Sequence, residues 1–180
     1  NGTAGGSAIF NTATPVNLSA LSIPNGLLGG TAAVSAGSFN WRGGTVSVPS
    51  LSVTGTTTLL GVSGGLQWHQ FSGTAWSFGT ATTWEDGTIV GLGAGSTIIN
   101  PIGGTWDLQG AASVAGLTGS SVSNAGTLRM VGSTSDFNVS DSSFANSGTL
   151  RLRIGGTGVG QFDRVLVGGS VTLGGTLTVE

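Results

Sequence analysis

The chain has 180 residues, of which 35 are glycine and only 7% are charged, and its net charge at pH 7 is −2. Arginine supplies all the strongly basic residues, and the absence of a basic cluster argues against nucleic-acid binding. Because 38% of the residues are hydrophobic and none is cysteine, the composition excludes a disordered chain, disulfide bonds and thiolate metal sites.

Short segments in which apolar and small polar residues alternate run along the chain. In chain order they are residues 18–23, 44–48, 48–53, 64–68, 88–92, 104–108, 126–130, 148–152 and 170–179. The alternation has the period of two that a strand with one buried face produces, and we find no long amphipathic helix. The turns between segments carry Asn and Gly, as in PNG (24–26), NAG (124–126) and NSG (146–148). We expect these turn residues to adopt the left-handed backbone of tight corners.

The segment NAGTLRM at 124–130 returns as NSGTLRL at 146–152, and a Gly-Thr-apolar tripeptide or a relative of it recurs about every 22 residues. Two residues after each tripeptide glycine stands an apolar residue. These residues predict one buried column, made of Val46, Leu66, Ile89, Trp106, Leu128, Leu150 and Leu177. The residue that follows is mostly polar, which predicts an outward column containing Asp107, Arg129 and Arg151.

A strand that recurs this often cannot be a propeller blade, which needs about 40–45 residues, and helical repeats would show a period of 3.6. The pattern therefore predicts an all-β fold, a parallel β-solenoid with rungs of about 22 residues. Eight or so rungs would form a rod about 40 Å long. We expect residues 1–180 to be a single β-solenoid domain, as a segment or subunit of a larger extracellular assembly.

Residues 144–179 resemble the closing rungs of bacterial autotransporter and filamentous-haemagglutinin-type adhesins. Those proteins carry F-x-N-x-G-T-L followed by G-x-x-x-D-x-L-x-V-x-G-x-x-x-L-x-G-T-L-x-V. The matching residues are Phe144, Asn146, Gly148, Thr149, Leu150, Asp163, Leu166, Val167, Gly169, Leu173, Gly175, Thr176, Leu177 and Val179. The resemblance is good over residues 121–180 and loose elsewhere. It implies a right-handed parallel β-helix that is exported, so we expect a secreted or cell-surface location.

Some parallel β-helices are polysaccharide-active enzymes, so each acidic residue is a candidate catalyst. Glu85 and Asp86 abut a turn glycine, Asp163 belongs to the adhesin-like motif, and Asp107 stands one rung from Arg129, which favours a surface ion pair. We therefore predict no catalytic residue and no enzymatic activity. The single histidine, His69, is expected to be exposed on a strand, and with no cysteine it cannot form an ordinary zinc site. No metal or other cofactor is expected.

Three tryptophans, Trp68, Trp76 and Trp84, stand eight residues apart. Trp68 and Trp106 fall in inward columns and are expected in the core. Trp76 and Trp84 are candidates for stacking against sugars, so a carbohydrate-binding β-helix module is the alternative function. Threonine pairs raise the further idea of ice binding, but the rungs after Gly104, Gly126 and Gly148 lack the pair.

The first and last rungs of a solenoid leave strand edges and core unpaired. Neither end of this sequence shows a charged helix or long loop that would cover them, so we expect self-association through Ile9, Phe10, Leu173, Leu177 and Val179. The partners expected are other copies of the chain or flanking repeats, with a surface glycan or host receptor as a further possibility. No apolar run reaches the roughly 20 residues of a membrane helix, so no membrane insertion by this segment is expected. The leading hypothesis is a non-enzymatic extracellular adhesin stalk or filament subunit.

Overall fold

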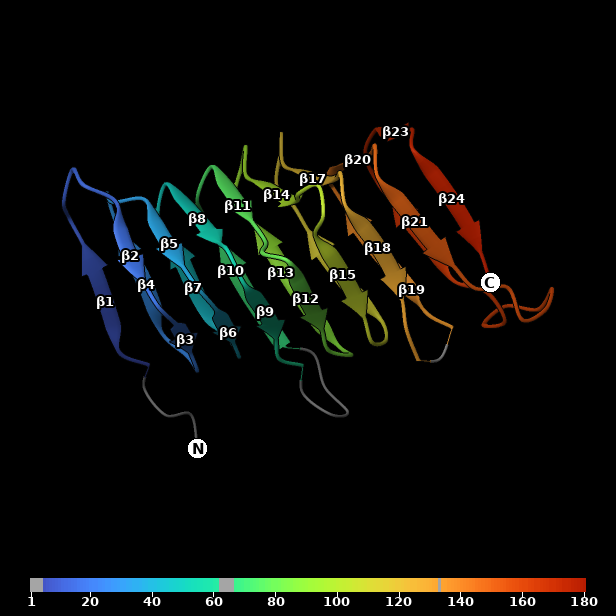
Figure 1. The fold of residues 1–180 in the computed structure, drawn as a ribbon, viewed down its shortest axis with the longest axis horizontal. Coiled ribbons are helices and arrows are strands. Elements are labelled where there is room, and N and C mark those ends of the chain that lie inside the picture. Colours follow the sequence, from blue (N-terminus) through green and yellow to red (C-terminus); the bar gives the residue numbers. More distant parts are fainter. Residues whose placement is uncertain (1–4, 62–66, 133) are drawn as a thin grey trace.

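The computed structural model describes residues 5–61, 67–132 and 134–180, and within them every regular element is a β-strand. The strands form three parallel sheets of eight strands each, wound so that successive strands belong to successive sheets. Figure 1 shows the result as a rod, with the blue N-terminal strands at one end of the long axis and the red C-terminal strands at the other. The predicted all-β parallel solenoid is confirmed.

Each rung contributes one strand to every sheet. The first sheet contains β1 (Ser7–Phe10), β4 (Leu27–Gly30), β7 (Gly44–Ser47), β10 (Gln67–Phe71), β13 (Thr88–Leu92), β16 (Ala112–Ala115), β19 (Asp136–Ser140) and β22 (Arg164–Val167). The second contains β2 (Val16–Leu18), β5 (Val34–Ala36), β8 (Ser50–Val53), β11 (Ala75–Ser77), β14 (Thr97–Asn100), β17 (Ser121–Asn124), β20 (Ser143–Asn146) and β23 (Val171–Leu173). The third contains β3 (Leu21–Ile23), β6 (Phe39–Trp41), β9 (Thr56–Leu59), β12 (Ala81–Trp84), β15 (Thr105–Leu108), β18 (Thr127–Met130), β21 (Thr149–Leu152) and β24 (Thr176–Val179).

The rungs stack in register, so each residue lies beside its equivalent in the next rung. Leu128 pairs with Leu150, as predicted, and both are buried. Rung length varies, with a step of 22 residues from Asn124 to Asn146 and of 28 from Asp136 to Arg164. The corners absorb this variation, because the strands themselves contain only three to five residues.

The predicted single column of seven apolar residues is wrong in part, because the tripeptide precedes strands of two different sheets. Val46 belongs to the first sheet, whereas Trp106 belongs to the third. Ile89 is only partly buried and Val90 is the fully buried residue, because Thr88 turns inward and donates its hydroxyl to the Glu85 carbonyl at 2.7 Å. Of the other members, Leu177 is 62% exposed and Leu66 lies outside the described residues.

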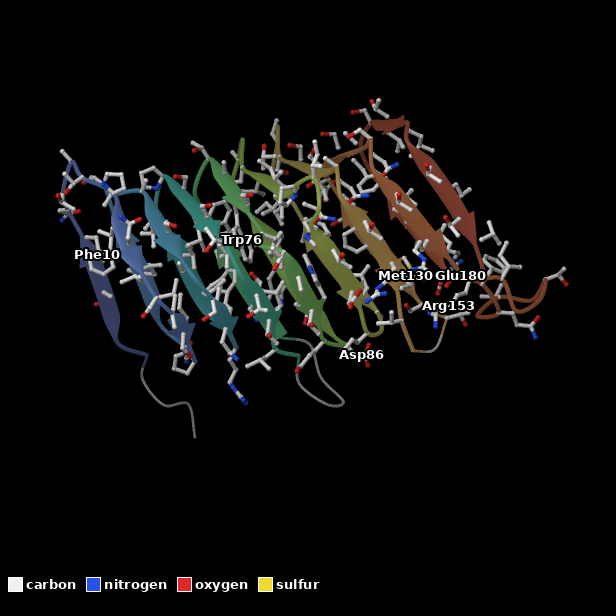
Figure 2. All side chains as sticks on the ribbon, viewed as in Figure 1. Phe10, Trp76, Asp86, Met130, Arg153 and Glu180 are labelled. Carbon is white, nitrogen blue, oxygen red and sulfur yellow. The ribbon has the colours of Figure 1, made fainter. Side chains whose placement is uncertain are left out.

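Large aromatic rings fill the middle rungs of the rod. The ring of Trp76 lies 5.2 Å from Trp41 and 4.3 Å from Phe78, centroid to centroid. Phe78 in turn meets Trp106 edge-on at 4.8 Å. Edge-on and tilted pairs of this kind add to the stabilisation that burial alone provides. Figure 2 shows Trp76 midway along the rod.

The repeated corner positions require glycine for a different reason from the one expected. Gly126 and Gly148 do not have the left-handed backbone, although Gly26, Gly87 and Gly175 do. A Cβ on Gly148 would lie 2.0 Å from the carbonyl oxygen of Gly126, and one on Gly126 would lie 2.2 Å from that of Gly104. Close stacking of one rung on the next therefore requires glycine at this corner.

The asparagines of the same repeat form a ladder inside the rod. Asn100 donates its amide to the Asn124 side-chain oxygen at 2.6 Å, and Asn124 donates to Asn146 at 2.6 Å. Asn146 ends the ladder by donating to the Gly174 carbonyl at 2.6 Å. Asn124 also donates to the Thr149 carbonyl at 3.2 Å. The ladder gives hydrogen bonds to buried corner carbonyls, which would lower the stability of the fold if they had no donor.

The ladder can be tested by replacing Asn124 with aspartate, which keeps the shape and removes the donor. The carboxylate would face the acceptor oxygens of Asn146 and Thr149, so we expect the free energy of unfolding at pH 7 to fall by about 3 kcal/mol or more. Burial raises the pKa of such an acid, so the loss is complete above its folded-state pKa and disappears below about pH 4. Urea denaturation across this pH range measures the effect.

The control is Asn138→Asp, which adds the same charge on the exposed side of β19. We expect it to change the free energy of unfolding by less than about 0.5 kcal/mol. Equal losses in the two variants would show that the ladder contributes nothing specific.

Candidate functional site

The last rung exposes the core at one end of the rod. Leu173 is 68% exposed, Leu177 is 62% exposed and Val179 is 55% exposed. A hollow of about 430 Å³ opens there, lined by Leu173 and Leu177 together with Phe144 and Leu150 of the preceding rung. Val179 stacks on Leu152, which packs against the core. This end face is therefore apolar.

The first rung forms the opposite end face. Phe10, Val16, Leu18 and Leu21 are partly buried against the core from one side only. Figure 2 shows Phe10 near this end and Glu180 near the other. A second hollow of about 330 Å³ opens here, and its lining includes Ala8, Leu21, Ile23 and Leu28.

Four of the five residues expected to mediate self-association thus belong to the end faces, namely Phe10, Leu173, Leu177 and Val179. Ile9 does not. It is 50% exposed and lies on the outer surface beside Gly29. A Cβ added to Gly29 would lie only 3.0 Å from Cδ1 of Ile9. Alternation along β1 turns Ile9 away from the neighbouring core residue Phe10.

The tryptophan and histidine assignments are reversed in the structure. Trp76 and Trp84 are 0% exposed, so the expectation that they stack against sugars is wrong. Trp68, expected in the core, is 55% exposed. His69 takes the inward position instead and is fully buried, with its Nε2 2.9 Å from the Trp41 carbonyl oxygen and its ring edge-on to that indole.

The predicted outward column of charged residues is confirmed. Arg129 binds the Asp107 carboxylate through two nitrogens, and its hydrogen bond to that carboxylate raises the pKa of the guanidinium. Arg151, one rung further, binds Glu180 instead. Two like charges can therefore stand on adjacent rungs because each has its own acidic partner on the other side. Such exposed pairs typically contribute about 0–1 kcal/mol each.

Asp163 is a buried carboxylate that fastens the loop between β21 and β22. Its side chain is 0% exposed and accepts hydrogen bonds from the backbone N–H of Ser135 at 2.9 Å and of Arg153 at 2.8 Å. The Arg153 guanidinium adds bonds at 2.9 and 3.0 Å. Burial opposes ionisation, but these hydrogen bonds outweigh it and hold the pKa of Asp163 below its usual value. Both carboxylate oxygens are thus engaged in structure.

A groove of about 390 Å³ lies beside this loop, and its mixed polar and apolar lining contains Asp86, Asp136 and Arg164. Asp136 is paired with Arg164 at 2.6 Å, and Asp86 accepts the Ala111 N–H at 2.9 Å. In the described ranges, no three His, Asp or Glu side chains gather as a possible metal site. The groove therefore contains carboxylates with structural partners and offers no free acid–base pair.

Comparison with known proteins adds no relative to this picture. No family model, curated protein or solved structure matches the chain. The described part also contains no helix long and apolar enough to cross a membrane. The geometry of the rod and of its end faces is therefore the main guide to function.

Replacing Asp163 with asparagine should weaken the attachment of the loop. One of the two oxygens would become an NH2 donor that faces the N–H of either Ser135 or Arg153, and the charge that binds the Arg153 guanidinium would be lost, so we expect the free energy of unfolding to fall by about 3 kcal/mol at pH 7. The folded-state pKa of Asp163 is lowered, so its stabilisation is present above the ordinary value of 3.8 and is lost as the pH falls through the lower folded value. The wild type and Asp163→Asn should therefore converge in strongly acidic solution.

The matched control is Asp86→Asn, because Asp86 is exposed and its single acceptor role toward Ala111 survives in an amide. We expect this variant to lose less than about 1 kcal/mol. Denaturant titrations followed by circular dichroism at neutral and acidic pH measure both. A difference in the free energy of unfolding between the wild type and Asp163→Asn that does not change with pH would contradict the stabilising role of the ionised Asp163.

Proposed function

We propose that this chain is a non-enzymatic structural β-solenoid, an extracellular adhesin stalk or filament subunit, whose copies join end to end through their first and last rungs. The apolar end face around Leu173 and Leu177 is the observation that carries the proposal. Soluble monomers rarely leave such core-like surface open, and natural solenoids normally cap it with polar residues.

A second copy has a surface that fits this end face, which flanking repeats of a longer chain would also cover. Its first rung would bring the partly buried Phe10, Val16, Leu18 and Leu21 onto the hollow beside Leu177. The open edges of β22, β23 and β24 would pair with β1, β2 and β3 of that copy, as strands pair inside the rod. Full burial of a leucine or valine side chain contributes about 1.5–3 kcal/mol. Several such residues together could support a stable junction.

The distribution of charge favours the same contact. Residues 1–41 contain no Asp, Glu, Lys or Arg, so the first rungs present no charge that would repel another edge. Charges on edge strands are a common protection against this kind of pairing. At the other end, the nearby Arg151 is paired with Glu180 and Arg164 with Asp136. Neither end face therefore opposes stacking electrostatically.

Two further parts of the proposal have indirect support. The secreted or cell-surface location and the adhesive role rest on the adhesin-like motif of residues 144–179. The absence of enzymatic activity is supported by the engagement of Asp107, Asp136 and Asp163 with arginines, which leaves these carboxylates without a free catalytic role.

Light scattering of the purified chain at micromolar concentration tests the proposal. We expect assemblies that grow with concentration, and filaments in negative-stain electron micrographs. Leu177→Arg places a charge on the end face, so we expect it to abolish assembly, while the circular dichroism spectrum remains that of the folded rod. The loss of self-affinity should be at least about hundredfold.

Leu166→Arg is the control, because Leu166 lies on the same last rung and is 40% exposed but belongs to the column of the exposed Asn138. Assembly should survive this change. A chain that stays monomeric at all concentrations, or that assembles equally well with Leu177→Arg, would contradict the proposal.

A further inference from the structure

Trp68 is set apart from the other four tryptophans of the chain. Trp41, Trp76, Trp84 and Trp106 are all 0% exposed, whereas Trp68 is 55% exposed on the outer surface of the first sheet. It occupies β10 beside the equally outward Ile89 of β13. In a chain that otherwise buries every indole, this ring is the largest apolar group left open to solvent.

The surroundings of Trp68 hold its ring along the sheet surface. A Cβ on Gly91, which lies diagonally across on the next strand, would be 3.4 Å from Cζ3 of Trp68 and 2.6 Å from Oε1 of Gln70. Gly91 is buried although it is on the outward side of the sheet, because these two side chains cover it. The indole therefore reaches Gly91 with its Cζ3 edge, while more than half of the residue's surface stays open to solvent.

Neutral polar groups surround this ring. Gln70 stands one column away and pairs with Thr45 of the preceding rung. Ser113 and Asn138 continue the column of Trp68 and Ile89 over the next two rungs. None of the strands β7, β10, β13 and β16 contains Asp, Glu, Lys or Arg. These four strands thus combine an aromatic ring with amide and hydroxyl groups, and the nearest charged residues lie outside them, Arg42 before β7, Glu85 and Asp86 before β13, and Asp136, paired with Arg164, on β19.

We infer that the outward face around Trp68 binds the sugar rings of a neutral polysaccharide. The indole face is electron-rich and packs against the C–H groups of a pyranose ring. Amide side chains such as Gln70 and Asn138 both donate and accept hydrogen bonds, which matches neighbouring sugar hydroxyls. An acidic glycan or a nucleic acid would find no cation on the four strands around the indole to offset its charge. This site is on the side of the rod and does not depend on end-to-end assembly.

Binding can be measured with soluble oligosaccharides of glucan, mannan, xylan and galactan, with sialylated and sulfated glycans alongside. We expect the wild type to bind at least one neutral series and Trp68→Ala to bind it at least about tenfold more weakly, since losing one stacked ring has effects of this size. Acrylamide quenching gives an independent readout. The wild type should show one accessible tryptophan that bound sugar protects, and Trp68→Ala should show none.

Two further variants test the geometry. Leu166→Ala removes another exposed apolar side chain from the same outward column and should leave sugar binding unchanged within about twofold. Gly91→Ala adds a methyl group beneath Gln70 and the indole without left-handed backbone strain, and it should weaken binding. No binding to any neutral glycan, binding of charged glycans only, or equal binding by wild type and Trp68→Ala would overturn the inference. So would a Trp68→Ala variant that changes self-association rather than sugar binding, since the face would then be an interface between copies.

Discussion

The in-register stacking of parallel rungs is the constraint on which the rest of this structure depends. Each residue lies directly beside its equivalent one rung away. Every position must therefore hold residues that can stack on an identical residue or on a complementary one. Leucine stacks on leucine at Leu128 and Leu150, and asparagine on asparagine at Asn124 and Asn146. Where arginines stack, each binds an acid on its far side. The sequence repeats because the contact repeats.

The same constraint distinguishes the sides of the rod from its ends. On the sides, outward columns are free of packing requirements, so a single large ring such as Trp68 can be placed there without disturbing the core. At the ends, the inward columns stop, and Leu173 and Leu177 are left with a neighbour on one side only. The ends therefore suit a junction with another rung, and the sides suit recognition of a ligand.

Sequence periodicity was enough to predict the solenoid, the Leu128–Leu150 contact and the Asp107–Arg129 pair, because all three follow from a constant step between rungs. It was not enough at the corners, where rung length changes. A shift of one residue there exchanged Trp68 with His69, and Ile89 with Val90, between inside and outside. The sequence also could not show why Gly126 and Gly148 must be glycine. The reason is the short distance from each of them to the carbonyl oxygen of the neighbouring rung, and only the structure gives that distance.

The central claim, that the contact between rungs also joins molecules, has a direct test. The outward column of the third sheet runs from Ser22 to Thr178, so in an end-to-end junction Thr178 of one copy would lie beside Ser22 of the next. The chain has no cysteine, so the variant carrying both Ser22→Cys and Thr178→Cys can form only introduced disulfides. Mild oxidation should give a ladder of covalent oligomers on a non-reducing gel, which neither single variant gives. A double variant that remains monomeric, or that matches the single variants, would contradict the claim.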